Sequence, residues 1–266
     1  MSMIRLPEAK RYPPAGYCIY CKRTPPEVTL SLEHIIPLAI NGHLLLPAAS
    51  CEICAKIINE QFERGFLRDS VIDVRAHLKM RSRSKRRNKE LPPSERPGRI
   101  ARFSDTGAFL EWEQISREDH PFAYVGVTLE APTILMNKPA KNHITVYGGE
   151  LYFDKTYYEK TMKIKGRWGL VQNFSPDQLC REIAKIAHGA AIAELGTTFE
   201  PFLPPIILGQ SSEIFHLVGG AINTEKPTAE THSLSLTVMG GFWVAIVRLF
   251  AVLGAPALMA VVGRKR

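Results

Sequence analysis

Four cysteines in two Cys-x-x-Cys pairs constrain the fold more than any other feature of the chain. The first pair is Cys18 and Cys21, the second is Cys51 and Cys54, and 29 residues separate the pairs. Four soft thiolates suit a tetrahedral Zn²⁺ and leave no open position on the ion. The sequence therefore predicts a structural zinc site. Because a simple zinc ribbon has about 15–20 residues between its pairs, additional structure is expected between these two.

The beginning of the chain favours thiolate ligands over disulfides. Residues 1–16 contain charges and prolines where a secretory signal requires an apolar segment. We therefore expect no export and a cytoplasmic, reducing location, in which paired cysteines more often bind metal than form disulfides.

The residues between and after the cysteine pairs predict a β-hairpin followed by helix. Residues 29–32 have strand composition, Asn41-Gly42 is a turn signal, and a second apolar run follows it. Beyond Cys54, apolar residues recur at nearly helical spacing from about residue 52 to 78. Zinc would thus hold the base of a hairpin that leads directly into a helix.

The hairpin contains the stretch EHIIP at residues 33–37. Together with the flanking cysteine pairs and the polar Asn59 five positions beyond the last cysteine, it makes residues 17–68 similar to the HNH endonuclease family, whose core is a ββα-metal finger. The resemblance implies that His34 is the general base and that Glu33 and Asn59 ligate a catalytic divalent cation such as Mg²⁺. Glu63, one helical turn further on, is an alternative ligand.

The chemistry of these residues agrees with the implied roles. An imidazole can take up a proton near neutral pH, and carboxylate and amide oxygens are hard ligands of the kind Mg²⁺ prefers. Because adjacent strand residues point to opposite faces, Glu33 and His34 can serve one site only if the strand bends or bulges there. The alternatives are solvent exposure for Asn59 and Glu63 and a structural role for His34.

Basic residues are concentrated in the first part of the chain. Residues 1–103 contain 19 Lys and Arg against 10 Asp and Glu, whereas the remainder contains 15 against 16. The densest run, residues 79–89, contains no acid. Such a run attracts polyanions, because neutralised phosphates release counterions. We expect a DNA-binding arm, with a solvated linker as the alternative; its proposed contacts are Arg81, Arg83, Lys85, Arg86 and Arg87.

The sequence predicts an α+β chain in three parts: an HNH domain with zinc knuckles at 1–78, a basic linker at 79–103 and an α+β domain at 104–266. Within the last part, 123–129 and 143–153 have strand composition, the latter with a turn signal at Gly148-Gly149. A helix is expected from the N-cap Ser175 to Gly196, with Cys180 and His188 in the core. This part could bind a protein partner or form a homodimer.

The apolar residues 238–262 are numerous enough to cross a bilayer. Arg248 lies near their middle, however, where insertion costs about 2.5–3.5 kcal/mol. Glycines and Pro256 also divide the segment into strand-sized pieces. A buried hairpin is therefore favoured over a membrane span.

Together these features favour a metal-dependent endonuclease that hydrolyses DNA. The alternatives are a zinc-stabilised nucleic-acid-binding protein without cleavage activity and, if residues 238–262 span a bilayer, a membrane-tethered protein.

Overall fold

The computed structural model describes residues 3–80, 97–141, 143–153, 155–170, 174–222 and 226–265. The predicted arm, with Arg81, Arg83, Lys85, Arg86 and Arg87, lies outside the described residues. The described part is α+β, as predicted.

The largest layer is an antiparallel sheet of six strands. Its order is β1 (Ile4–Arg5), β12 (Ser233–Met239), β13 (Phe242–Arg248), β14 (Ala257–Lys265) and β10 (Phe199–Pro201), and β11 (Val218–Ile222) also pairs with β14. The 3-10 turn η6 (Ala251–Leu253) joins β13 to β14, which confirms the predicted hairpin of residues 238–262. None of the described helices is long and apolar enough to cross a membrane.

Cys51, Glu33 and His34 belong to a smaller three-stranded sheet. Its order is β2 (Ala9–Arg11), β4 (His43–Cys51) and β3 (Leu30–His34), with η1 (Leu38–Ile40) in the β3–β4 connection. The chain then continues through α1 (Glu52–Ile58), the π-helical turns η2 (Asn59–Glu63) and η3 (Phe66–Ser70), and α2 (Ile72–His77). The predicted helix is thus a helical segment that contains two wider turns.

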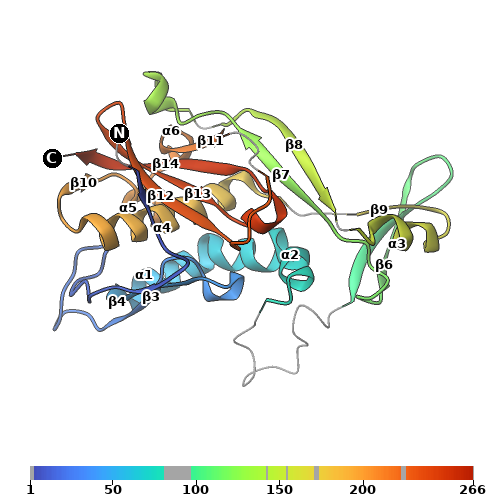
Figure 1. The fold of residues 1–266 in the computed structure, drawn as a ribbon, viewed down its shortest axis with the longest axis horizontal. Coiled ribbons are helices and arrows are strands. Elements are labelled where there is room, and N and C mark those ends of the chain that lie inside the picture. Colours follow the sequence, from blue (N-terminus) through green and yellow to red (C-terminus); the bar gives the residue numbers. More distant parts are fainter. Residues whose placement is uncertain are drawn as a thin grey trace.

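The helix α4 (Pro176–Leu195) lies between these two layers (Figure 1). Ser175 caps it by accepting a hydrogen bond from the backbone N–H of Gln178, and Gly196 ends it, as predicted. Because α4 contacts β13 and β14 on one side and η2 on the other, it is buried almost all round. Cys180 and His188 are fully buried, which confirms their assignment to the core.

The remaining elements form a ribbon and a second three-stranded sheet. The ribbon is β7 (Ala123–Leu129) with β8 (Val146–Phe153), and the sheet has the order β6 (Phe109–Ile115), β5 (Gly98–Phe103) and β9 (Arg167–Leu170). The short helical elements are η5 (Thr133–Met136), α3 (Tyr157–Lys163), α5 (Pro204–Ile207) and α6 (Ile214–Leu217).

The predicted turn at Gly148-Gly149 is wrong. Both glycines lie within β8, opposite Thr128 and Val127 of β7. The chain reverses earlier, near η5, where Asn137 adopts a left-handed φ of 54°. A glycine pair permits a tight turn but does not require one, and a left-handed asparagine provides the same backbone freedom.

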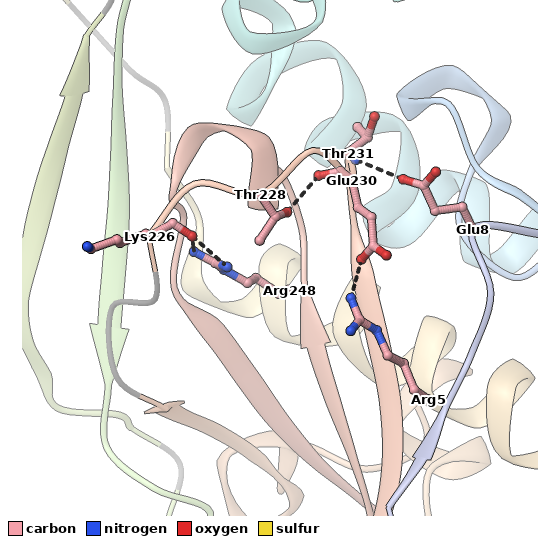
Figure 2. A network of polar contacts seen from close by, with 7 residues as sticks. All are labelled: Arg5, Glu8, Lys226, Thr228, Glu230, Thr231 and Arg248. Atoms are coloured by element: carbon pink, nitrogen blue, oxygen red, sulfur yellow. Dashed lines mark hydrogen bonds and ion pairs between the residues drawn. The ribbon is translucent and has the colours of Figure 1, made fainter.

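The start of the chain is attached to the six-stranded sheet. Ile4 pairs with Leu236, Arg5 forms an ion pair of 2.7 Å with Glu230, and Glu8 accepts a hydrogen bond from the backbone N–H of Thr231. Figure 2 shows the contacts of Arg5 and Glu8 beside that of the buried Arg248, whose guanidinium donates to the carbonyl of Lys226.

The predicted three-part division of the chain crosses several of the observed contacts. Buried residues from the first 80 positions and from the last third belong to one hydrophobic cluster. Residues 98–103, assigned to the linker by prediction, form strand β5. The limits of separately folding units stay a prediction.

Candidate functional site

The two cysteine pairs converge in space. The four sulfur atoms all lie within 4.8 Å of one another, and the Cys21 and Cys51 sulfurs are 3.8 Å apart. Sulfurs at the corners of a tetrahedron are about 3.8 Å apart when each lies about 2.3 Å from a central Zn²⁺. Cys18, Cys51 and Cys54 are buried. The cluster therefore fits a metal ion such as zinc, held as a closed structural site.

Hydrogen bonds within the cluster favour the charged thiolate of Cys18 at the expense of its neighbours: the bond to Cys18 raises the pKa of Cys54 well above its ordinary value, and burial raises the pKa of Cys51. The Cys54 thiol and the backbone N–H groups of Cys21, Cys51 and Tyr20 lower the pKa of Cys18 to about 4, although burial opposes them. Arg23 donates from Nε to the Cys21 sulfur at 3.3 Å. Donors directed at thiolates support metal binding, because only the deprotonated sulfur is a strong ligand.

The cysteine cluster holds the base of the β3–β4 hairpin, and His34 lies at the opposite end of β3. Leu30 pairs with Cys51, and His34 pairs with Leu45. The register shifts between Ser31 and Glu33. The extra residues belong to β4, where 47–49 lie opposite Leu32, whereas Glu33 and His34 pair in consecutive register with Leu46 and Leu45. A bulge changes the direction of neighbouring side chains, but the bend at Glu33 and His34 that a shared site requires stays a prediction.

The connection after His34 has little conformational freedom. Asn41 has a φ of 62°, and a Cβ on Gly42 would lie only 1.9 Å from the carbonyl oxygen of Ile36. Only glycine fits at position 42 without moving this backbone. The turn signal Asn41-Gly42 thus corresponds to a tight connection that fixes the end of β3.

Glu33 points into the protein and meets Glu63 at a buried ammonium group. Glu33 is 8% exposed and Lys185, on α4, is 4% exposed. Lys185 Nζ lies 3.3 Å from Glu33 Oε1 and 2.8 Å from Glu63 Oε2. Glu182 Oε1, also on α4, lies 3.8 Å from the same nitrogen. We call Glu33, Glu63, Glu182 and Lys185 the charged cluster; it joins β3, η2 and α4.

Burial and charge act in opposite directions on these groups. Burial raises the pKa of Glu33 while Lys185 opposes the rise, and burial raises the pKa of Glu182 to about 8. Burial alone would lower the pKa of Lys185, but the three carboxylates outweigh it and hold this pKa well above its ordinary value. Lys185 is therefore protonated at neutral pH.

The fold brings together only some of the predicted site residues. His34 is half-buried, and its backbone carbonyl accepts a hydrogen bond of 3.4 Å from Lys185. Asn59 is exposed where α1 passes into η2, and Glu63, the alternative ligand of that turn, is the residue that meets Glu33. The role of Asn59 stays a prediction.

Lys185 and Glu182 were missed at the sequence level. No motif connects α4 with EHIIP, and the two charges appear in the sequence as the polar positions of an amphipathic helix. The sequence offered one signal, a Glu and a Lys three residues apart within an alanine- and isoleucine-rich stretch. It did not decide between burial and exposure, because a helix with a single exposed face would place both charges next to solvent.

Residues 18–70 match the model of a family described as HNH endonuclease. The matched segment begins at the first cysteine of the cluster and ends with η3, so it includes Glu33, His34, Asn59 and Glu63. Comparisons with curated proteins and with solved structures gave no match. The chain thus contains an N-terminal HNH domain that carries the cysteine cluster.

Proposed function

We propose that the HNH domain is a metal-dependent endonuclease that hydrolyses phosphodiester bonds in DNA, with His34 as the general base. The observation that carries this proposal is the match to the HNH endonuclease family over the segment that contains the cysteine cluster, the β3–β4 hairpin and His34. Such a base removes a proton from the attacking water.

The carboxylates of Glu33 and Glu63 support a divalent-cation site beside His34. Both converge on Lys185 Nζ, and each uses one oxygen for that contact, Oε1 of Glu33 and Oε2 of Glu63. Because a carboxylate has two oxygens, each side chain can contact the ammonium and still offer an oxygen, a hard ligand suited to Mg²⁺. A bound cation would offset the charge that develops on the phosphoryl group and on the departing oxygen.

The cysteine cluster has a separate role in this proposal. We propose that it holds a structural Zn²⁺, because four thiolates fill the coordination sphere and leave no position for a substrate. The ion would hold the base of the hairpin while β3 positions Glu33 and His34. The basic arm would bind the DNA backbone, and we expect the protein to act in the cytoplasm.

The activity is tested with supercoiled plasmid. We expect the purified chain to nick the plasmid with Mg²⁺ or Mn²⁺. Nicking should stop when EDTA is added in excess, while the zinc is still bound. Zinc content measured in the same samples separates loss of the catalytic cation from unfolding. A chain that binds DNA but does not nick it with any divalent cation would instead be the non-catalytic, zinc-stabilised binding protein.

Two substitutions test whether Glu63 or Asn59 is the second protein ligand of the divalent cation. We expect Glu63→Gln to lower Mn²⁺ affinity and the nicking rate by about 100-fold, because a carboxylate facing Glu33 is lost. Asn59→Ala is expected to change both by less than about threefold, since this side chain is exposed. The reverse ranking would assign the ligand to Asn59.

A further inference from the structure

The C-terminal half of the chain contributes Lys185 to the proposed nuclease site. Lys185 comes from α4, outside the segment that matches the HNH family. Its ammonium contacts Glu33, Glu63 and the backbone carbonyl of His34. It therefore contacts both protein elements, β3 and η2, from which the proposed ligands and base come.

We propose that Lys185 is a positioning residue that completes the divalent-cation site; this inference rests on the proposed function. By binding the carboxylates of Glu33 and Glu63, the ammonium restricts the orientation of both side chains. The bond to the His34 carbonyl fixes the end of β3. Groups that orient metal ligands in this way commonly change metal affinity by 10–100-fold when removed.

Lys185 also limits repulsion within the charged cluster. Three carboxylates and one ammonium leave a formal excess of two negative charges (three minus one) when all four groups are ionised. Without the ammonium, three carboxylates would remain close together in a buried region, where repulsion separates side chains or drives them to take up protons. Either change removes ionised, correctly placed oxygens.

The direct test is Mn²⁺ binding, measured by electron spin resonance of the free ion on the zinc-loaded full-length chain. We expect Lys185→Met to weaken binding by 10–100-fold and to lower the nicking rate in parallel. Lys185→Arg should stay within about threefold of the wild type, because a guanidinium keeps the charge and the donors. The matched control is Arg181→Met, which removes a cation from the same helix whose partner is Asp177; its Mn²⁺ affinity should equal that of the wild type.

A second variant keeps the test informative if Lys185→Met does not fold. Lys185→Met combined with Glu182→Gln removes one cation and one carboxylate, so the formal charge of the cluster is unchanged while the bridging ammonium is lost. We expect this double variant to fold, as judged by near-UV circular dichroism, and still to bind Mn²⁺ weakly. If neither variant folds, Lys185 is only a structural ion-pair partner and the inference fails.

The remaining outcomes separate this inference from the proposed function. Wild-type or tighter Mn²⁺ affinity in either folded variant would show that Lys185 is dispensable or competes with the cation, and it would overturn the inference alone. A wild-type chain that neither binds Mn²⁺ nor nicks plasmid would overturn the proposed function and this inference with it.

Discussion

Removal of the proposed zinc ion, by a chelator or by Cys54→Ser, is expected to unfold the β3–β4 hairpin and the helical segment behind it. Structural zinc contributes about 10–16 kcal/mol of binding free energy in small metal-dependent folds, whereas whole domains are stable by only about 5–15 kcal/mol. Cys18, Cys51 and Cys54 also belong to the hydrophobic cluster at the base of the hairpin, where Leu30 pairs with Cys51.

The unfolding should extend beyond the cysteines. His188 on α4 lies 2.8 Å from the carbonyl oxygen of Ile19, inside the first cysteine loop, and Gly189 packs against Ile35. Because these contacts connect α4 to the hairpin, loss of the hairpin exposes one side of a helix that is buried on both. We therefore expect one cooperative loss of near-UV circular dichroism rather than local fraying.

The matched control is the fifth cysteine. Cys180 is fully buried on α4 and lies outside the cluster. Cys180→Ala removes a buried sulfur but no proposed metal ligand, so it should cost about 1–2 kcal/mol of unfolding free energy and leave the zinc content at one ion per chain. If Cys54→Ser melted like Cys180→Ala and retained its metal, the structural role of the cluster would be wrong.

Features encoded by neighbouring residues could be predicted from the sequence. The hairpin beside the cysteine cluster follows from the cysteine spacing and Asn41-Gly42, and the limits of α4 follow from Ser175 and Gly196. In each case a local backbone conformation or cap has few chemical solutions, so the residue types nearly determine the structure. The tail was assigned correctly for a similar reason: Arg248 is costly in a bilayer but can be satisfied by carbonyls within a protein.

Contacts between distant segments could not be predicted in this way. Nothing near Glu33 indicates that its partner is Lys185, because the contact depends on where α4 packs and not on any spacing in the sequence. The attachment of β1 to β12 is equally nonlocal. Burial on both sides of α4 explains why the contacts of Glu182 and Lys185 were missed: an amphipathic pattern assumes one face in solvent, whereas this helix lies between two layers.

His34→Ala is expected to lower the nicking rate by about 10²–10⁴-fold, the usual contribution of a general base, while Mn²⁺ affinity and thermal stability stay close to the wild type. The side chain of His34 is only half-buried, and adjacent strand residues point to different faces, so Glu33 should keep its contacts. Alanine also retains the backbone carbonyl that Lys185 binds.

The control for this substitution is His43→Ala, which removes an exposed histidine at the start of β4 in the same hairpin. We expect its nicking rate to stay within about twofold of the wild type. Equal rates for the two variants would remove His34 from the chemistry. A loss of activity in His34→Ala together with a loss of Mn²⁺ binding would assign His34 to the cation site, because a base acting on water alone leaves cation affinity unchanged.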